Sequence, residues 1–268
     1  MSRNILSEIA ERTKERVAAQ KKILPQEKLM ATIEAAESGF TKLPYAFPFE
    51  EALAGKEISF ICEVKKASPS KGVIAAHFPY MEIAREYEAA GAAAISVLTE
   101  PFWFKGHDDF LKNIAEEAKI PLLRKDFTVD EYMIYEAKLL GASAVLLICA
   151  ILDEKTLVEY TKIAHKIGLS ALVEAHDEDE VKMAVAAGAR VIGVNNRDLR
   201  TFEVDITLSE QLKKFVPSDV LFISESGIST AEDVRRLREI GAHAVLIGES
   251  LMRGKDKKAA VKNLLYGG

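Results

Sequence analysis

Glu63 and Lys65 follow directly after the apolar run 58–62, which has the composition of a buried strand. Side chains two positions apart on a strand point to the same face, so this carboxylate and this amine should meet. Serine, proline and glycine in segment 66–72 then predict a loop. An acid and an amine beside a polar turn could transfer protons, although the segment alone is more simply explained as a surface ion pair.

Charged and amide side chains end several further apolar runs in the same way. In a barrel of parallel strands the active site lies at the carboxyl ends of the strands, so these residues would face one mouth. Lysines and glutamates gathered there would carry a large desolvation cost, which is typical of a site that performs chemistry. Opposed charges at short range also shift pKa values, so a lysine could act as a general acid and a glutamate as a general base. The residues are Glu63, Lys65, Lys125, Glu174, Asn195, Arg197, Glu225, Ser226, Glu249 and Ser250.

Two loops that contain glycine and serine follow the last two apolar runs. They include Ser226-Gly227 and Gly248-Glu249-Ser250. Such residues let backbone amides close on a phosphate above the start of a short helix. Two ordinary turns would have the same composition, but a pair of them after the last two strands of a barrel favours a phosphate ester as substrate.

Three aromatic residues are adjacent in segment 99–106, which includes the only tryptophan of the chain. Phe102, Trp103 and Phe104 could anchor this loop to the body of the protein. They could equally form an apolar wall that stacks against an aromatic ring of the substrate.

The cysteines and histidines do not indicate a disulfide or a metal site. Cys62 and Cys149 each lie inside an apolar run, which suits small buried side chains in a reducing compartment. The five histidines lack metal-ligand spacing, and His107 fits the start of a helix better than a chelate. We therefore expect no metal, no cofactor and no catalytic histidine.

The elements that would position these residues are eight apolar runs that alternate with amphipathic helical patterns. Gly-Ala steps at Gly91, Gly141, Gly188 and Gly241 supply left-handed caps between helix and strand. No Gly-x-Gly-x-x-Gly follows the first run, and the even spacing favours a closed barrel over a doubly wound sheet. The predicted fold class is α/β, a (βα)8 TIM barrel with an N-terminal helical extension. Strands are expected at 58–64, 94–98, 121–124, 144–148, 170–174, 191–195, 220–224 and 244–247.

Residues 1–268 are interpreted as one barrel domain, of which 1–57 form a helical extension before the first strand. Helical patterns cover about 3–21 and 26–37, and Pro25 suits a helix start. The extension would either plug the bottom of the barrel or cover its catalytic mouth, and the sequence supports the two alternatives about equally.

The overall composition limits the possible partners. The chain has 49% hydrophobic and 29% charged residues, which suits one compact domain. A formal net charge of -5 argues against nonspecific binding to nucleic acid or to anionic membranes. The start of the chain lacks the apolar core of a signal peptide, and no apolar run reaches membrane-spanning length. We therefore expect a cytoplasmic monomer that meets a small-molecule anion locally.

Six of these motifs together resemble the indole-3-glycerol phosphate synthase family of tryptophan biosynthesis. The resemblance runs nearly end to end and implies that the barrel converts 1-(2-carboxyphenylamino)-1-deoxyribulose 5-phosphate into indole-3-glycerol phosphate, carbon dioxide and water. No cofactor is implied. The motifs are segment 63–72, Leu98-Thr99-Glu100 with Phe104 and Gly106, segment 125–127, Val173-Glu174, segment 195–199 and segment 224–228.

The resemblance also implies roles for single residues. Lys125 would protonate the ketone, Lys65 and Glu174 would serve dehydration, and the division of roles among these three stays open. Lys65 would also meet the substrate carboxylate, with Glu63 as its electrostatic support. The catalytic set is Lys125, Glu174, Lys65, Glu63, Asn195 and Ser226; the substrate-binding set is Ser68, Phe104, Phe127, Arg197 and Glu225; the phosphate-binding set is Gly227, Gly248 and Ser250.

Two other functions fit part of the pattern. Another phosphate-binding barrel enzyme, such as phosphoribosylanthranilate isomerase, would share the last two loops but would rely on Asp and Cys, or on two Asp, as acid and base. A phosphate-sensing barrel without turnover would have no use for buried opposed charges.

Overall fold

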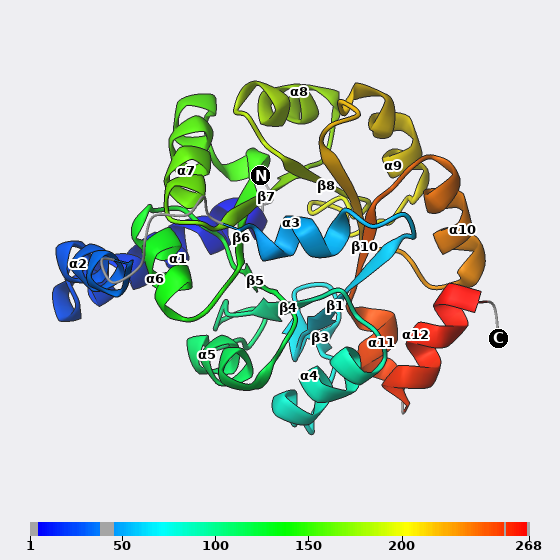
Figure 1. The fold of residues 1–268 in the computed structure, drawn as a ribbon, viewed down its shortest axis with the longest axis horizontal. Coiled ribbons are helices and arrows are strands. Elements are labelled where there is room, and N and C mark those ends of the chain that lie inside the picture. Colours follow the sequence, from blue (N-terminus) through cyan, green and yellow to red (C-terminus); the bar gives the residue numbers. More distant parts are fainter. Residues whose placement is uncertain (1–4, 38–45, 255, 267–268) are drawn as a thin grey trace.

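Eight parallel strands close into a barrel in the computed structural model, which describes residues 5–37, 46–254 and 256–266 (Figure 1). The first barrel strand, β1, pairs with both β4 and β10, and this pairing closes the sheet. The predicted barrel is therefore confirmed, and each predicted strand agrees with the structure to within one residue at either end. The barrel strands are β1 (Ser59–Val64), β4 (Ala94–Leu98), β5 (Leu122–Lys125), β6 (Ala144–Ile148), β7 (Ser170–Ala175), β8 (Val191–Asn195), β9 (Leu221–Glu225) and β10 (Ala244–Ile247).

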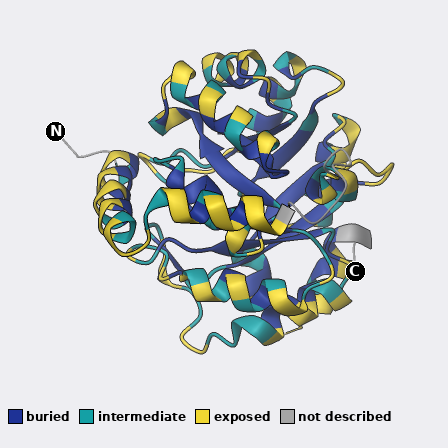
Figure 2. Ribbon diagram, turned by 60° about the vertical axis from the view of Figure 1, so that its left-hand side comes forward, coloured by how far each residue is buried: buried dark blue, intermediate teal, exposed yellow. Residues whose placement is uncertain are grey.

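Helices surround the barrel and turn their apolar faces toward the strands (Figure 2). Asp153, Asp177 and Thr230 cap three of them by accepting hydrogen bonds from backbone amides of the first turn. Gly91 and Gly141, with φ of 92° and 86°, supply two of the left-handed caps that the Gly-Ala steps predicted. These helices are α4 (Tyr80–Ala89), α5 (Asp108–Glu117), α6 (Tyr132–Leu139), α7 (Glu154–Lys166), α8 (Glu178–Ala186), α9 (Thr207–Leu212), α10 (Ala231–Glu239), α11 (Glu249–Arg253) and α12 (Lys257–Tyr266), with short 3₁₀ turns η1 (Cys149–Ile151) and η2 (Lys213–Phe215).

The N-terminal extension contains the two predicted helices, α1 (Ile5–Ile23) and α2 (Gln26–Glu37), and a third helix, α3 (Pro48–Leu53), that was not predicted. Positions 3 and 4 of the first predicted helix lie outside the described residues. The α3 helix lies across the bottom of the barrel, where Phe49 and Leu53 are buried in its interior cluster (Figure 1). Glu50 fixes it there by accepting a hydrogen bond from the hydroxyl of Ser170, 2.8 Å away at the start of β7.

The α1 helix serves the opposite end of the barrel. Leu6 and Ile9 are buried in the interior cluster beside Phe127 and Ile148, near the carboxyl ends of β5 and β6. The guanidinium of Arg16 donates to Asp126 Oδ2 at 2.8 Å. Both alternatives for the extension are therefore correct, each for a different helix: α3 plugs the bottom, and α1 reaches the mouth.

Two smaller predictions are confirmed by the same structure. Cys62 and Cys149 are free and buried, as expected. His107 is the N-cap of α5, and its Nδ1 accepts the backbone amide of Asp109 at 3.1 Å. Among the described residues, no helix combines the length and the apolar character needed to cross a bilayer.

Candidate active site

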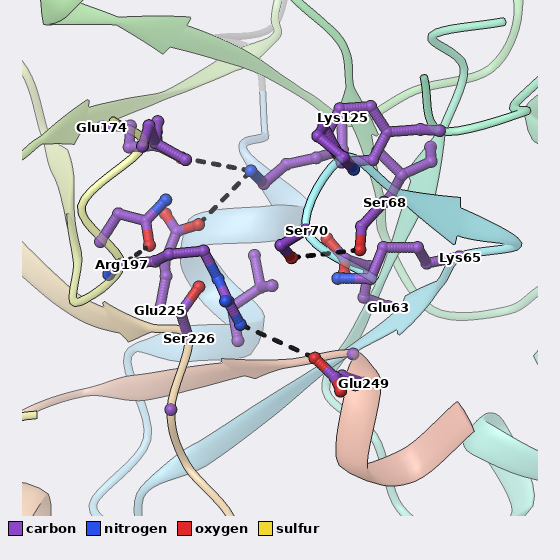
Figure 3. A pocket seen from close by; sticks show the side chains of 18 of the residues that line it. Glu63, Lys65, Ser68, Ser70, Lys125, Glu174, Arg197, Glu225, Ser226 and Glu249 are labelled. Carbon is purple, nitrogen blue, oxygen red and sulfur yellow. Dashed lines mark hydrogen bonds and ion pairs between the residues drawn. The ribbon is translucent and has the colours of Figure 1, made fainter. Parts of the chain in front are cut away.

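A cavity of about 370 Å³ opens at the carboxyl ends of the barrel strands (Figure 3). Every site residue predicted from the sequence lines it, including those from loops far apart in the chain. Its floor is polar and charged, whereas the wall toward α1 is apolar. Within the described ranges, no group of His, Cys, Asp and Glu side chains is arranged to hold a metal ion.

Lys125 lies at the centre of the charged floor, at the end of β5. Its Nζ is 3.2 Å from Oε2 of Glu174 on β7 and 3.5 Å from Oε2 of Glu225 on β9 (Figure 3). Burial by itself would lower the pKa of Lys125, but the carboxylates of Glu174, Glu225 and Glu63 outweigh it and raise this pKa above its ordinary value. The lysine is therefore held as an ammonium group and could act as a proton donor.

The two carboxyl groups beside Lys125 differ in their surroundings. Burial by itself would raise the pKa of Glu174, but Lys125 and His176 hold it well below its ordinary range. For Glu225, burial and the carboxylates of Glu174 and Glu63 raise the pKa to about 7 against the charge of Lys125. Glu225 Oε1 is buried and has no hydrogen-bond partner among the described residues. Glu174 is thus a lasting carboxylate, whereas Glu225 can take up a proton near neutral pH.

Glu63 and Lys65 form a second pair at the end of β1, as their spacing predicted. Lys65 Nζ forms an ion pair with Glu63 Oε2, and Glu63 is 4% exposed. Gly248 makes room for this pair, because a Cβ there would overlap the Glu63 carboxylate and come within 3.0 Å of Lys65 Nζ. An exposed surface pair would need no such clearance, so the alternative of a surface ion pair is wrong.

The loops after β9 and β10 approach each other at one side of the cavity. Ser226 and Gly227 both adopt positive φ, 66° and 82°, which turns the chain sharply after β9. Asn196 holds this turn by donating from Nδ2 to the Ser226 carbonyl at 3.0 Å. The Ser250 hydroxyl donates to the carbonyl of Ile228 at 3.3 Å and joins the two loops. The pair of loops is therefore fixed in place before any anion binds.

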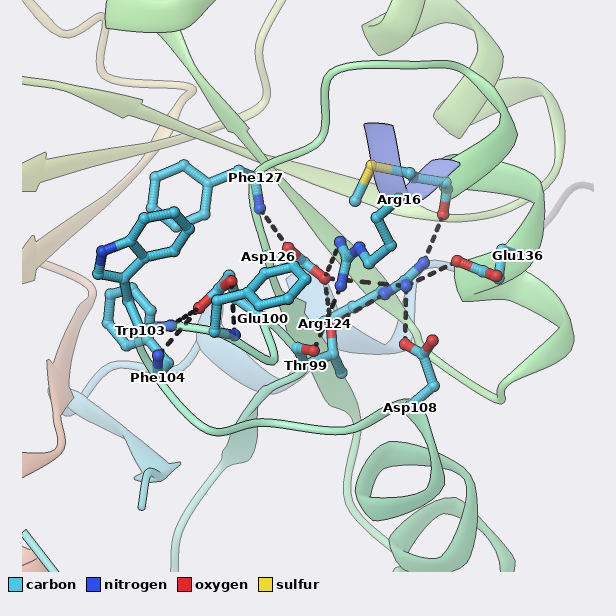
Figure 4. A network of polar contacts seen from close by, with 12 residues as sticks. Arg16, Thr99, Glu100, Trp103, Phe104, Asp108, Arg124, Asp126, Phe127 and Glu136 are labelled. Carbon is cyan, nitrogen blue, oxygen red and sulfur yellow. Dashed lines mark hydrogen bonds and ion pairs between the residues drawn. The ribbon is translucent and has the colours of Figure 1, made fainter. Parts of the chain in front are cut away.

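The three adjacent aromatic residues in the loop after β4 have different surroundings. Phe104 lines the cavity, with its ring centroid 6.0 Å from that of Phe127. Trp103 packs on the interior cluster, and Phe102 is 46% exposed with the Arg12 guanidinium 4.7 Å from its ring centroid. Glu100 shapes the loop, because its carboxylate accepts the backbone amides of residues 102–104 at 2.8–2.9 Å (Figure 4). Trp103 therefore anchors the loop and Phe104 forms part of the cavity wall, while stacking against a substrate ring stays a prediction.

Behind β5, on the side away from the cavity, a second charged cluster surrounds Arg124 (Figure 4). Its guanidinium donates to Asp108 and Glu136 at 2.7 Å each and to the Thr99 hydroxyl at 3.2 Å. It also donates to the carbonyl of Met133 at 3.0 Å. This cluster joins β5 to α5 and α6 and does not line the cavity.

Sequence reasoning missed several residues at the cavity. Ile5, Leu6 and Ile9 of α1 contribute its apolar wall. His176 contacts Glu174 from just beyond β7, with Nε2 3.4 Å from Oε1. The signal for it was present, because Glu174 and His176 have the same two-residue spacing as Glu63 and Lys65.

The chain matches a family model described as indole-3-glycerol phosphate synthase over residues 6–264. Two curated proteins of that name are similar to it over nearly their whole length. The one from Ruminiclostridium cellulolyticum is 58% identical over 261 residues, which cover 97% of this chain and 98% of the relative. The one from Lachnoclostridium phytofermentans is 51% identical over 266 residues, with the same coverage.

Solved structures with this fold are more distant in sequence. The 3-hexulose-6-phosphate synthase from Salmonella typhimurium superposes with a TM-score of 0.64 at 16% identity, and the match covers 77% of this chain and 96% of that one. At such low identity the likeness supports the barrel fold alone.

Proposed function

The chain belongs to the indole-3-glycerol phosphate synthase family, and we infer that the cavity at the barrel mouth is where it closes the indole ring. The enzyme is a carboxy-lyase of tryptophan biosynthesis that acts on a small phosphate-bearing substrate. Within that activity, the roles given below to single residues are our proposal.

The substrate, 1-(2-carboxyphenylamino)-1-deoxyribulose 5-phosphate, has three parts that match three parts of the cavity. Its phosphate binds the loops after β9 and β10, at Gly227, Gly248 and Ser250. Its aromatic ring binds between Phe104, Phe127 and the apolar wall of α1. Its carboxylate pairs with Lys65, the cation at the end of β1.

The remaining polar residues orient the sugar chain between these ends. The side-chain oxygen of Asn195 accepts a hydrogen bond from the backbone amide of Arg197 at 3.1 Å. This hydrogen bond fixes the orientation of the side-chain NH₂ group, which can then donate to the substrate. Arg197 stands 3.7 Å from Glu249 across the mouth, and Ser68 stands 3.4 Å from Ser70. These groups, with Ser226, hold the substrate hydroxyls and fix the distance between the ring and the ketone.

Ring closure is the first chemical step. The ring carbon that bears the carboxylate attacks the ketone carbon, a carbon–carbon bond forms, and the π electrons of the ketone move to its oxygen. Lys125 donates a proton to that oxygen as negative charge develops. Two carboxylates within 3.5 Å keep the lysine protonated and aimed before the substrate reacts.

Decarboxylation and dehydration follow. The bond to the carboxylate breaks, carbon dioxide leaves, and the electron pair restores the aromatic ring. The new hydroxyl then leaves as water after protonation by Lys65 or Lys125, and Glu174 removes the proton whose electrons form the indole double bond. Glu63 forms an ion pair with Lys65, and Glu225 contacts Lys125 alongside Glu174.

One observation carries this proposal: an ammonium group lies between two carboxyl groups inside a cavity that also has an aromatic wall and paired glycine–serine loops. A phosphoribosylanthranilate isomerase would need different acid and base residues, so this site favours the synthase. The cavity is lined by residues of a single chain. The two cysteines of the chain are free and buried, which suits a reducing compartment. These features, with the net charge of -5, support a cytoplasmic monomer that binds neither nucleic acid nor membranes.

The test is to incubate the purified chain with the carboxyphenylamino-deoxyribulose phosphate and follow indole fluorescence and carbon dioxide together. We expect equal amounts of the two products. The same substrate without its phosphate should react with a much lower kcat/KM, because the energy of phosphate binding is lost. Folded protein that forms no indole would refute the assignment.

A further inference from the structure

His176 is a largely buried imidazole at the edge of the active site, and the mechanism above gives it no chemical step. Its Nδ1 is 3.0 Å from Oε2 of Glu180, and its Nε2 is 3.4 Å from Oε1 of Glu174. The same Glu180 oxygen also accepts a hydrogen bond from the backbone amide of His176 at 2.7 Å, so the Glu180 carboxylate is held beside the imidazole ring. Because both ring nitrogens face carboxylate oxygens, only the doubly protonated ring presents an N–H to each.

The two oxygens of Glu174 face different cations as a result. Oε2 lies 3.2 Å from the ammonium of Lys125, and Oε1 lies 3.4 Å from Nε2 of His176, at ion-pair distance but without hydrogen-bond geometry. Glu225 has Lys125 alone, at 3.5 Å, and its Oε1 has no hydrogen-bond partner in the part of the chain that the structure describes. The two carboxyl groups that share Lys125 are therefore unequal.

The charges around the lysine show why this asymmetry matters. Glu63 and Lys65 form a pair of their own at the end of β1, whereas Glu174 and Glu225 share Lys125. Two buried carboxylates beside a single ammonium favour uptake of a proton by one of them. Around this ring, the thiol of Cys149 on η1 is buried and neutral. The other charged groups of α8 and its N-cap are Asp177, Glu178, Asp179 and Lys182, and all four are exposed.

We propose that His176, held between Glu180 and Glu174, is a positioning residue that keeps Glu174 ionised and aimed, so that Glu225 is the carboxyl group that takes up a proton. This inference rests on the proposed function of Glu174 as the base of dehydration. Burial by itself would lower the pKa of His176, but its contacts with Glu174 and Glu180 raise it to about 10. The imidazolium is thus present throughout the neutral range and acts through Glu174 without touching the substrate.

The first test reads the ring directly and needs no activity. A titration of the imidazole nitrogens by NMR in the wild-type protein should show His176 doubly protonated at pH 8. In Glu180→Gln, which keeps an oxygen acceptor but removes the charge, the pKa of His176 should fall by at least about one unit. A neutral ring at pH 7 in the wild-type protein would overturn the proposal.

The second test is the pH dependence of turnover in His176→Gln, with the exposed His77→Gln as the matched control. Without the imidazolium, Glu174 itself takes up a proton as the pH falls, in competition with Glu225, and protonated Glu174 cannot act as the base. The acidic limb of the kcat profile should therefore shift to higher pH by at least about one unit. At pH 6 kcat should fall about tenfold, whereas KM should stay within about twofold and most activity should return by pH 9. Glu180→Gln should shift the limb the same way by a smaller amount.

A His176→Gln profile that superposes on that of the wild type would overturn the proposal. Loss of activity that is equal at every pH would indicate a merely structural role and would overturn it as well. If the wild-type protein forms no indole at all, the proposed function fails, while the NMR titration still reports on the contact between His176 and Glu174.

Discussion

Arg124 and Lys125 are adjacent cations on β5, and they point to opposite sides of the barrel wall. Arg124 is 2% exposed and donates to four acceptors at 2.7–3.2 Å, three of them on side chains and one on the Met133 carbonyl. Lys125 faces the cavity with one hydrogen bond, to Glu174 at 3.2 Å, and a longer contact to Glu225.

The difference shows how a buried charge can serve stability or chemistry. The Arg124 cluster leaves none of the guanidinium nitrogens without a partner, so its parts cannot move without losing a hydrogen bond. The Lys125 cluster contains an ammonium group with one hydrogen bond, and a carboxyl oxygen, Glu225 Oε1, that has no hydrogen-bond partner among the residues described. The outer cluster joins β5 to its helices, and the inner cluster remains available for the substrate.

The largest effect should come from removal of the proposed base in the inner cluster. Glu174→Gln keeps the shape of the side chain but cannot accept a proton, so we expect kcat to fall about 10²–10⁴-fold. Steady-state indole formation measures this loss, and unfolding in urea should show a stability close to that of the wild type. A variant with wild-type kcat would mean that the inner cluster is not the reacting one.

The outer cluster should respond in the opposite way. Arg124→Met removes the shared cation from Asp108 and Glu136, and we expect the free energy of unfolding to fall by about 3–5 kcal/mol. The matched control is Arg85→Met, which breaks an exposed pair with Glu117 and should cost at most about 1 kcal/mol. Equal losses in the two variants would remove the distinction between the clusters.

A smaller effect is expected where the inner cluster needs empty space. In Gly248→Ala the added methyl group would push the carboxylate of Glu63 and the ammonium of Lys65 out of place, so kcat/KM should fall about tenfold to a hundredfold. Gly254→Ala, at the other end of α11, meets its nearest neighbour at an ordinary 3.4 Å and is the control. If both variants have the same kinetics, the clearance at Gly248 has no functional importance.

The smallest effect concerns stability and pH at Glu225. The pKa of this carboxyl group is raised to about 7 in the folded state, mainly by burial, so its contribution to stability is complete below pH 4.5 and is lost as the pH rises through 7. Glu225→Gln cannot ionise and should therefore gain about 1–2 kcal/mol over the wild type between pH 5 and pH 8.5. Urea unfolding of both proteins at the two pH values measures this gain, and a constant difference would contradict it.

The sequence was sufficient to predict the barrel and the composition of its mouth. Strands buried on both faces are continuous apolar runs, and the polar residue that ends each run marks the same end of the barrel. For this reason β8 was placed at 191–195 and Asn195 at the mouth, both in agreement with the structure.

The features that could not be predicted depend on contacts between distant segments. The α3 helix has only six residues and no side-chain cap, and the barrel bottom rather than its own sequence stabilises it. The hairpin of β2 (Ala67–Ser68) and β3 (Gly72–Val73) is likewise too short to give a pattern. His176 is an exception, because its two-residue spacing from Glu174 is a local signal, although that spacing does not resemble a metal-ligand pattern.

The most direct test of the central claim is turnover by Lys125→Met at pH 7, measured together with its urea unfolding. The substitution keeps the length of the side chain and removes the proton donor, so we expect kcat for indole formation to fall at least about a hundredfold. The free energy of unfolding should change by less than about 2 kcal/mol. Glu174 and Glu225, which lose their ammonium partner, can take up protons and so avoid leaving unpaired buried charges. A Lys125→Met enzyme that keeps kcat within tenfold of the wild type would contradict the assignment of Lys125 as the acid.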